Sequence, residues 1–305
     1  MTAPRRLAPS DLGRLSFGGA PIGGLYEEVT DDDARAAVTA AVDRGVRYFD
    51  TAPLYGHGLS ERRLGSVLGN REREAFVVST KAGRLLRPDG TPQDFWKGAP
   101  PEGPVFDFSS DGIRRSLDES LERLGLDGVD IVYVHDPDDH WEQARHEAYP
   151  ALLQLREQGV VRAIGVGMNQ CEMPVRFVRE TDIDIVLLAG RYTLLDRSGS
   201  RELLPLCEER GVTVVAAGVF NSGVLAGGST YDYQPAPFEI RQQVTDLEKA
   251  CARFGVPLAA AAIQFPLRHP AVATVLVGAR TAREVEENAR LMEVEIPDAL
   301  WEELA

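Results

Sequence analysis

Short apolar segments alternate with amphipathic segments along almost the whole chain. Several apolar segments are continuous runs, which is typical of parallel strands buried on both faces. They predict eight strands, at residues 15–17, 46–50, 76–80, 129–134, 161–166, 185–188, 212–216 and 274–277. Helical spacing between them predicts eight helices, at residues 31–44, 60–68, 109–124, 142–158, 173–180, 202–209, 257–267 and 281–289.

This alternation favours an α/β fold, a single-domain (β/α)8 barrel (TIM barrel) over residues 1–305. Glycines at 45, 125, 159 and 211 follow predicted helices and are typical helix stop signals. An open doubly wound sheet is the alternative. It is weakened because no Gly-x-Gly-x-x-Gly phosphate motif follows the first predicted strand.

Two long insertions interrupt the repeat. Residues 82–107 follow the third strand, contain Phe95 and Trp96, and are interpreted as a lid or wall over a pocket rather than a flexible excursion. Residues 218–238 follow the seventh strand and lead into an extra helix through Phe254. This second insertion lies where barrels commonly bind phosphate.

Titratable side chains gather at the ends of three successive predicted strands. These strands end in Asp50, Lys81 and His135, and Tyr55 lies in the loop after the first. Taken alone, each has an ordinary structural explanation, such as a solvated strand end. Because parallel strands in a barrel end at the same rim, the four side chains are expected to converge where barrels keep their chemistry. A phenol beside a carboxylate and a cation indicates proton transfer.

The chain here resembles the aldo-keto reductase family, whose catalytic tetrad is Asp, Tyr, Lys and His in this order. The resemblance rests on Phe49-Asp50-Thr51-Ala52, Tyr55-Gly56 and Ser60-Glu61, and it extends over nearly the whole chain. It implies hydride transfer between a nicotinamide and a carbonyl or alcohol carbon, with Tyr55 as the acid or base. Lys81 would lower the pKa of Tyr55, Asp50 would hold Lys81, and His135 would orient the substrate oxygen.

Net charge and cysteine content narrow the class of protein and the partners to be expected. The charge is −14 without a basic run, so nucleic acid and anionic membranes are not expected partners. The three cysteines are widely spaced, which predicts neither a disulfide framework nor a metal site and fits the cytoplasm. No signal peptide or membrane-spanning run is seen. The oligomeric state stays open.

The resemblance also implies a set of residues that bind a cofactor, NAD or NADP. They are Asn169 and Tyr192 at the nicotinamide, Phe220, Asn221, Gly223 and Leu225 at the pyrophosphate, and Gly278, Arg280, Glu284, Glu287 and Asn288 at the adenosine. Asn169 as an ordinary loop residue, and Glu287 and Asn288 as a solvated helix face, are the alternatives. Met168 and Ala189 depart from the family pattern. Glu284 would repel a 2′-phosphate whereas Arg280 suits one, and the balance favours NAD.

Three further stretches resemble one branch of the family, the D-threo-aldose (L-fucose) dehydrogenases and pyridoxal 4-dehydrogenases. They are residues 17–25, 134–138 and 187–195. The branch implies oxidation of a sugar such as L-fucose to its lactone, or of a small aromatic alcohol. Candidate substrate residues are Trp96, Asp136 and Trp141, each also open to a structural role. General NADPH-dependent aldehyde or ketone reduction and a non-catalytic nicotinamide-sensing subunit are the alternatives.

Overall fold

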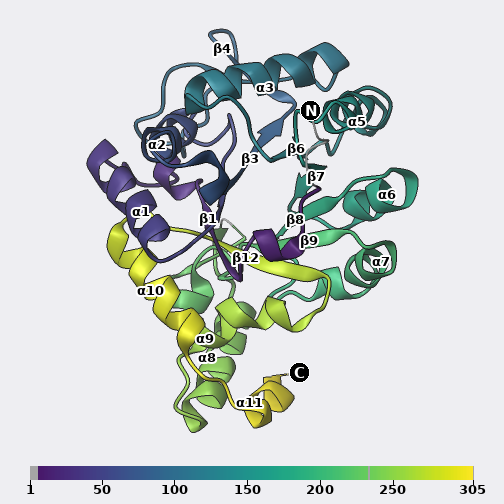
Figure 1. Ribbon diagram of the computed structural model, residues 1–305. Helices are drawn as coiled ribbons and strands as arrows, with labels where there is room; N and C mark the ends of the chain where they lie inside the picture. Colours follow the sequence, from purple (N-terminus) through teal and green to yellow (C-terminus); the bar gives the residue numbers. More distant parts are fainter. Residues whose placement is uncertain (1–5, 233, 305) are drawn as a thin grey trace.

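Eight parallel strands close into a barrel in the computed structural model, which describes residues 6–232 and 234–304. The order around the barrel is β1-β12-β9-β8-β7-β6-β3-β2. Helices surround the barrel on its outside (Figure 1). The predicted (β/α)8 barrel is therefore confirmed. An open sheet is ruled out because β1 pairs with β2 on one side and with β12 on the other.

The strands and helices follow the predicted order. The barrel strands are β1 (Leu15–Gly18), β2 (Tyr48–Asp50), β3 (Val77–Ala82), β6 (Ile131–His135), β7 (Ala163–Met168), β8 (Ile185–Ala189), β9 (Thr213–Ala217) and β12 (Val272–Gly278). The helices are α1 (Asp31–Asp43), α2 (Leu59–Leu68), α3 (Ser110–Leu124), α4 (Trp141–Gln143), α5 (Tyr149–Glu157), α6 (Glu172–Glu180), α7 (Leu203–Arg210), α8 (Phe238–Arg253), α9 (Leu258–Gln264), α10 (Ala282–Glu293) and α11 (Asp298–Leu304). A π-helical turn, Ala144–Ala148, joins α4 to α5.

The barrel interior changes from apolar to polar along the strands. Successive side chains of a strand point to opposite faces. In β3 this alternation sends Val77, Ser79 and Lys81 inward, while Val78 packs in the larger core between strands and helices. Leu12 fills the end where the strands begin, packed in the interior cluster that contains Val77. The polar side chains are thereby placed toward the ends of the strands.

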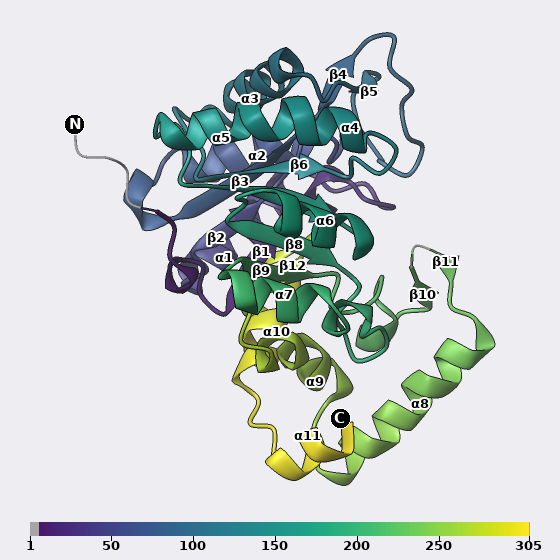
Figure 2. The same cartoon turned by 90° about the vertical axis from the view of Figure 1, so that its right-hand side faces the viewer.

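The first insertion forms an antiparallel hairpin, which the sequence did not predict. Its strands are β4 (Arg84–Arg87) and β5 (Gly103–Phe106). The rest of this insertion is fastened to the segment after β1 by a bridge between Leu25 and Trp96. In Figure 2 the hairpin lies on the side toward which the barrel strands run. The insertion is therefore an attached wall above the strand ends.

The second insertion and the end of the chain extend one side of the barrel. The short strands β10 (Thr230–Tyr231) and β11 (Gln234–Pro235) precede α8, the predicted extra helix, which packs with α11 (Figure 2). The sequence did not predict α11. Among the described residues no single helix is long and apolar enough to cross a membrane. One bent pair, Phe238–Arg253 with Leu258–Arg268, passes on length and composition alone.

Candidate active site

Strands β2, β3 and β6 are consecutive in the barrel, and they bring the four predicted catalytic residues together. The register places Asp50 opposite Ser79 and Lys81 opposite Tyr133. His135 ends β6, one residue beyond Val134, which lies opposite Ala82 at the end of β3. Tyr55 comes from the loop that follows β2. The convergence that parallel strand ends predict is therefore present in the structure.

A glycine-rich segment holds the loop that carries Tyr55. Gly23 lies so close to this loop that a Cβ on it would sit 2.7 Å from the carbonyl carbon of Tyr55. Gly19 is equally confined, since a Cβ there would be 2.8 Å from the carbonyl oxygen of Asp50. Only glycine permits such contacts between backbones. The glycines at residues 17–25 thus fix where Asp50 and Tyr55 stand.

Asp50 and Lys81 form a fully buried ion pair. Lys81 Nζ lies 2.6 Å from Asp50 Oδ2 and also donates to the carbonyl oxygen of Thr51 at 3.1 Å. Burial alone would lower the pKa of Lys81, but the neighbouring Asp50 carboxylate and Tyr55 outweigh burial and raise it above its ordinary value. Lys81 therefore keeps its positive charge in the interior of the barrel.

Tyr55 lies directly against this cation. Lys81 Nζ is 4.5 Å from the centre of the Tyr55 ring. Burial raises the pKa of Tyr55 above its ordinary value, and Lys81 opposes the rise without cancelling it. Lys81 thus lowers the pKa of Tyr55 as expected, but burial, which the expectation left out, has the larger effect. At neutral pH Tyr55 holds its proton and is available as an acid.

His135 is a neutral imidazole. Burial, helped by the cations Arg84 and Lys81, holds its pKa well below the ordinary histidine value. Its ring meets Tyr55 edge-on, with ring centres 5.9 Å apart. Its Nδ1 atom is buried without a hydrogen-bond partner among the described residues. A neutral histidine beside the phenol can donate or accept one hydrogen bond at a substrate oxygen.

Asp136 is already engaged by a residue that the sequence analysis missed. Arg84 Nη2 donates to Asp136 Oδ2 at 2.8 Å, and the same oxygen lies 3.5 Å from His135 Nε2. Asp136 also has a positive φ of 40°, which a non-glycine residue rarely adopts. The carboxylate of Asp136, a candidate substrate residue, is thus already paired with a guanidinium. Arg84 follows Lys81 by three residues, a placement that could have signalled it.

The structure places the two candidate substrate tryptophans in different surroundings. The Trp96 ring is buried against Tyr55, with centres 5.7 Å apart, so the wall from the first insertion reaches the tetrad. Trp141 packs edge-on against Phe177 and under the guanidinium of Arg176, both on α6. Packing on the outer helices accounts for Trp141, and the structure does not bring it to Tyr55.

The loop after β9, where pyrophosphate contacts are predicted, has three consecutive residues in left-handed conformations. Asn221, Ser222 and Gly223 have φ values of 44°, 60° and 103°. The N–H groups of Asn221 and Gly223 donate within the loop, to the carbonyl oxygens of Gly218 and Phe220, and Asn221 Nδ2 donates to the carbonyl oxygen of Gly190 at 3.3 Å. The side-chain oxygen Oδ1 of Asn221 is buried without a partner among the described residues and could accept a hydrogen bond from a ligand. Phe220 is half-buried beside this loop, whereas Leu225 is buried and contributes packing.

The two residues predicted at the nicotinamide have different surroundings. Asn169 is exposed just after β7, and its carbonyl oxygen accepts a hydrogen bond from Arg191 Nε at 2.7 Å. The Tyr192 ring packs on Phe265 and His269, with ring centres 5.1 and 6.0 Å away. Asn169 is thus held at the strand ends. Tyr192 is half-buried and packs on the turn that precedes β12, and stacking of its ring on a nicotinamide stays a prediction.

The residues predicted at the adenosine gather where β12 gives way to α10. Glu284 accepts a hydrogen bond from the backbone N–H of Arg280 at 2.7 Å, and its carboxylate lies 3.7 Å from the guanidinium. Glu27, after β1, lies 3.7 Å from the other side of Arg280. Arg280 is therefore flanked by two carboxylates. Gly278 ends β12, Asn288 is half-buried, and Glu287 pairs with Arg290 on the solvent side.

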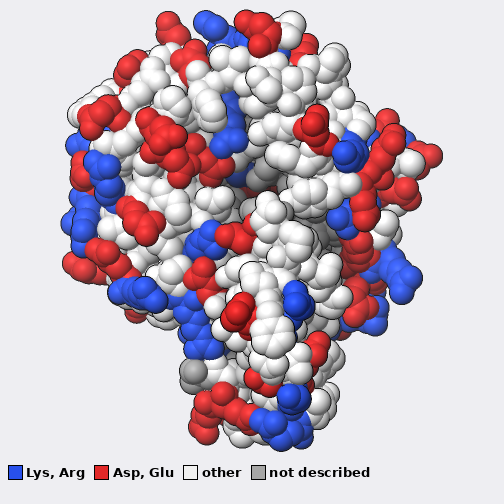
Figure 3. Space-filling model, turned by 180° about the vertical axis from the view of Figure 1, so that it is seen from behind, with Lys and Arg blue, Asp and Glu red and all other residues white. Residues whose placement is uncertain are grey.

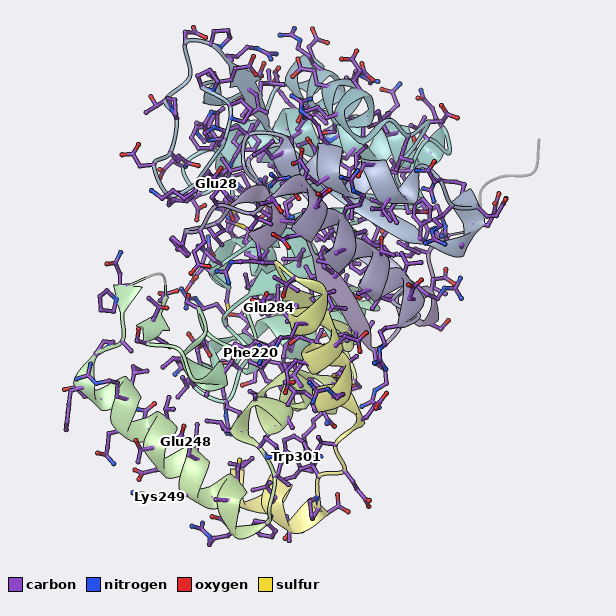
Figure 4. The ribbon with its side chains drawn as sticks, turned by 90° about the vertical axis from the view of Figure 1, so that its left-hand side faces the viewer. Glu28, Phe220, Glu248, Lys249, Glu284 and Trp301 are labelled. Carbon is purple, nitrogen blue, oxygen red and sulfur yellow. The ribbon has the colours of Figure 1, made fainter. Side chains whose placement is uncertain are left out.

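The face at the strand ends is hollowed. Figure 3 shows this face with a depression near its middle, bordered by both basic and acidic side chains. In Figure 4 Glu284 at the start of α10 lies between Glu28 above and Phe220 below. Glu284 and Phe220 follow the ends of β12 and β9, so these two predicted cofactor residues lie toward the same rim of the barrel as the tetrad.

Comparisons with known proteins agree on one family. A family model described as "Aldo/keto reductase family" matches residues 14–305. D-threo-aldose 1-dehydrogenase of Pseudomonas sp is 45% identical over 306 residues, covering 95% of this chain and 92% of the relative. Pyridoxal 4-dehydrogenase of Microbacterium luteolum is 41% identical, covering 94% of this chain and 91% of the relative.

A solved structure shares the whole fold. The aldo-keto reductase AKR11C1 from Bacillus halodurans, in its holo form, superposes with a TM-score of 0.78 at 26% sequence identity. The match covers 99% of this chain and 95% of the other. Family, fold and the arrangement of the tetrad therefore point the same way.

Proposed function

Because the chain belongs to the aldo/keto reductase family, we propose that this NAD(P)-dependent oxidoreductase oxidises an aldose such as L-fucose to its lactone. The observation that carries the proposal is the cluster of Asp50, Lys81, Tyr55 and His135 at one rim of the barrel. The similarity to D-threo-aldose 1-dehydrogenase supports the choice of substrate class.

The four side chains divide the work of moving one proton. A bound nicotinamide would supply the hydride chemistry in either direction of the reaction. Tyr55 takes the hydroxyl proton of the hemiacetal in oxidation and returns a proton in reduction. Lys81 stabilises the phenolate that Tyr55 becomes, and Asp50 keeps Lys81 in place. Neutral His135 orients the reacting oxygen.

The walls of the site suit a ligand with both polar and apolar faces. Trp96 presents an aromatic ring beside Tyr55, and such a ring packs on the C–H face of a sugar or on a flat aromatic substrate. The Arg84–Asp136 pair borders His135 and offers charged groups to hydroxyls. These features support a small polyol or a pyridoxal-like alcohol over an extended apolar chain.

The chain's similarity to pyridoxal 4-dehydrogenase favours that activity as the second candidate. General NADPH-dependent reduction of aldehydes and ketones, and a nicotinamide-sensing subunit without turnover, are the remaining alternatives. The three free thiols support the cytoplasm as the compartment. Substrate turnover separates these candidates, since a sensing subunit binds cofactor without consuming it.

The test is a panel of substrates with each cofactor. Formation of reduced nicotinamide would be followed with L-fucose, D-arabinose, L-galactose and pyridoxal, using NAD and NADP separately. We expect oxidation of one or more sugars. Oxidation of pyridoxal alone would move the assignment to the second candidate. Reduction of simple aldehydes by NADPH, without sugar oxidation, would contradict the aldose proposal.

For the cofactor we propose a preference for NAD, supported by the two carboxylates around Arg280. Glu27 and Glu284 offset the guanidinium charge and add like-charge repulsion to any 2′-phosphate placed there. We expect the double variant Glu27→Gln/Glu284→Gln to bind NADP about tenfold more tightly than the parent, since each exposed charge contributes about 1 kcal/mol or less. NAD affinity should change little.

The measurement is the dissociation constant of each dinucleotide from quenching of protein fluorescence. Glu28→Gln is the matched control, because it removes the neighbouring carboxylate that does not flank Arg280. An equal gain for NADP in Glu28→Gln, or no gain in the double variant, would show that these two carboxylates do not set the preference.

A further inference from the structure

A chain of buried hydroxyl groups leads from the barrel core to the carboxylate of Asp50. Ser79 Oγ donates to Asp50 Oδ1 at 2.7 Å. Ser79 Oγ is 2.9 Å from the hydroxyl of Tyr48, which is 3.0 Å from the hydroxyl of Tyr133. Ser79, Tyr48 and Tyr133 are completely buried. None of them belongs to the tetrad, and a barrel core could have been built from apolar side chains at these positions.

The number of hydroxyl protons fixes which group donates in each of these hydrogen bonds. An ionised carboxylate only accepts hydrogen bonds, and a hydroxyl has a single proton to donate. The Ser79 hydroxyl donates its hydrogen bond to Asp50, so the Tyr48 hydroxyl must donate to Ser79. The hydroxyl proton of Tyr48 is used in that hydrogen bond, so Tyr133 must donate to Tyr48. All three hydroxyl dipoles therefore point toward the Asp50 carboxylate, and bonds aligned in this way polarise one another.

We infer that Ser79, Tyr48 and Tyr133 form a positioning relay that keeps Asp50 ionised and thereby keeps Lys81 charged against Tyr55. This inference rests on the proposed roles of Tyr55 and Lys81. These three buried hydroxyls are positioning groups, because they act through Asp50.

The surroundings of Asp50 show why such a relay is required. Burial raises the pKa of the Asp50 carboxyl, and Lys81 and Ser79 are the groups that oppose the rise. Burial also raises the pKa values of Tyr48 and Tyr133 well above the ordinary tyrosine value, so both phenols stay neutral donors. Without Ser79, Lys81 alone would have to offset the burial of the carboxylate.

The other groups that face Lys81 come from three neighbouring elements. Tyr55 lies in the β2–α2 loop, while His135 and Asp136 lie at the end of β6. On β7 the neighbour is Gly167, where an added Cβ would be 3.5 Å from Lys81 Cε. Since His135 is neutral, and Arg84 pairs with Asp136, Asp50 is the carboxylate in direct contact with Lys81. The charge of Lys81 therefore depends chiefly on the state of Asp50.

The composition of the chain offers a direct readout. The sequence contains three lysines, Lys81, Lys97 and Lys249, and the last two are exposed. Lysine labelled with ¹³C at Cε should give three resolved signals, whose shifts report the protonation of each amine, and the titration extends to strongly alkaline pH because the pKa of Lys81 lies above its ordinary value. We expect Ser79→Ala to lower the pKa of Lys81 by about one pH unit or more, and Tyr48→Phe to lower it by less.

Ser16→Ala is the matched control. Ser16 Oγ lies 2.6 Å from Thr274 Oγ1 in an equally buried bond between β1 and β12, and no described contact connects it to Asp50. This control also removes one buried hydroxyl from the barrel. A pKa of Lys81 that is the same in Ser79→Ala and Ser16→Ala would overturn the relay. If Ser79→Ala fails to fold, Tyr48→Phe is compared with Ser16→Ala and decides in the same way.

Turnover gives the second readout. With the best substrate of the panel, we expect Ser79→Ala to lower kcat about tenfold with little change in KM, and to shift the alkaline part of the pH profile. The lysine titration uses no substrate. Failure to find a substrate would thus count against the proposed function alone, whereas an unchanged Lys81 titration would count against the relay alone.

Discussion

Replacing Tyr55 with phenylalanine is expected to lower kcat by about 10²- to 10⁴-fold, the usual contribution of a positioned acid or base. The substitution removes only the hydroxyl. The ring contacts with Trp96, His135 and Lys81 can all persist, so the variant should fold and keep the shape of the site. Steady-state rates in both directions, with equilibrium binding of NAD, measure the two effects separately. Binding of NAD should remain, because the hydroxyl serves only the reacting oxygen.

The same residue predicts how the rate depends on pH. Burial raises the pKa of Tyr55, so its proton stays in place throughout the neutral range. Oxidation needs the phenolate, and its rate should climb as the pH rises toward that pKa. Reduction needs the phenol and should fall over the same range. The pH profile of the rate should show no inflection from His135 above the ordinary histidine pKa, because its imidazole is already neutral there.

Retention of full activity by Tyr55→Phe would remove Tyr55 from the mechanism. Trp96→Phe is a useful companion variant, because it alters the ring that packs on Tyr55 without touching a titratable group. A loss in Trp96→Phe as large as that in Tyr55→Phe would indicate that packing, rather than the proton, determines the rate.

The parts of this molecule that follow from sequence are those with a repeating physical cause. Buried parallel strands need apolar residues on both faces, so β6 and β8 are visible as continuous apolar runs and β2 and β3 as shorter apolar stretches that end in polar residues. Their ends must lie at one rim, which brings Asp50, Lys81 and His135 together before any coordinates are known. The short α11 has no comparable signal, and the β4–β5 hairpin lies in a segment without a period.

The features that the sequence did not predict depend on contacts between residues far apart in the chain. Whether the ring of Tyr192 or Trp141 turns to the site or to an outer helix is decided by packing partners such as Phe265 and Phe177. The pKa of Tyr55 depends on how deeply the fold buries it, which a strand pattern does not specify. The hydrogen bond from Ser79 to Asp50 follows from the register of β2 against β3, where the two residues are opposite.

Removing either partner of the Asp50–Lys81 pair should cost more stability than removing both. Asp50→Asn leaves the Lys81 ammonium in the barrel without its carboxylate, and Lys81→Met leaves the carboxylate without its cation. An unpaired buried charge typically lowers the free energy of unfolding by about 3–5 kcal/mol. The double variant Asp50→Asn/Lys81→Met buries no charge and should recover much of this loss, although all three variants should be inactive.

Urea unfolding at several pH values tests this prediction and its sign. In folded Lys81→Met the lysine no longer opposes the effect of burial, so the pKa of Asp50 should be higher than it is in the parent. The unfolded chain then releases this proton at lower pH than the folded chain does. Lys81→Met should therefore lose stability as the pH rises through the interval between the two pKa values and regain it in acid. Asp50→Asn/Lys81→Met lacks both groups and should not show this dependence.

Lys249→Met provides the exposed counterpart, since Lys249 pairs with Asp246 at 3.1 Å on the surface of α8 and should hardly affect stability. Single variants of Asp50 and Lys81 that are no less stable than the double variant would show that the pair is not held as two charges. In that case a neutral Lys81 would face Tyr55, and stabilisation of the phenolate would have to come from another group. The stability of the pair and the acidity of Tyr55 thus depend on one condition, a charged Lys81 in an apolar barrel, and a single set of variants tests both.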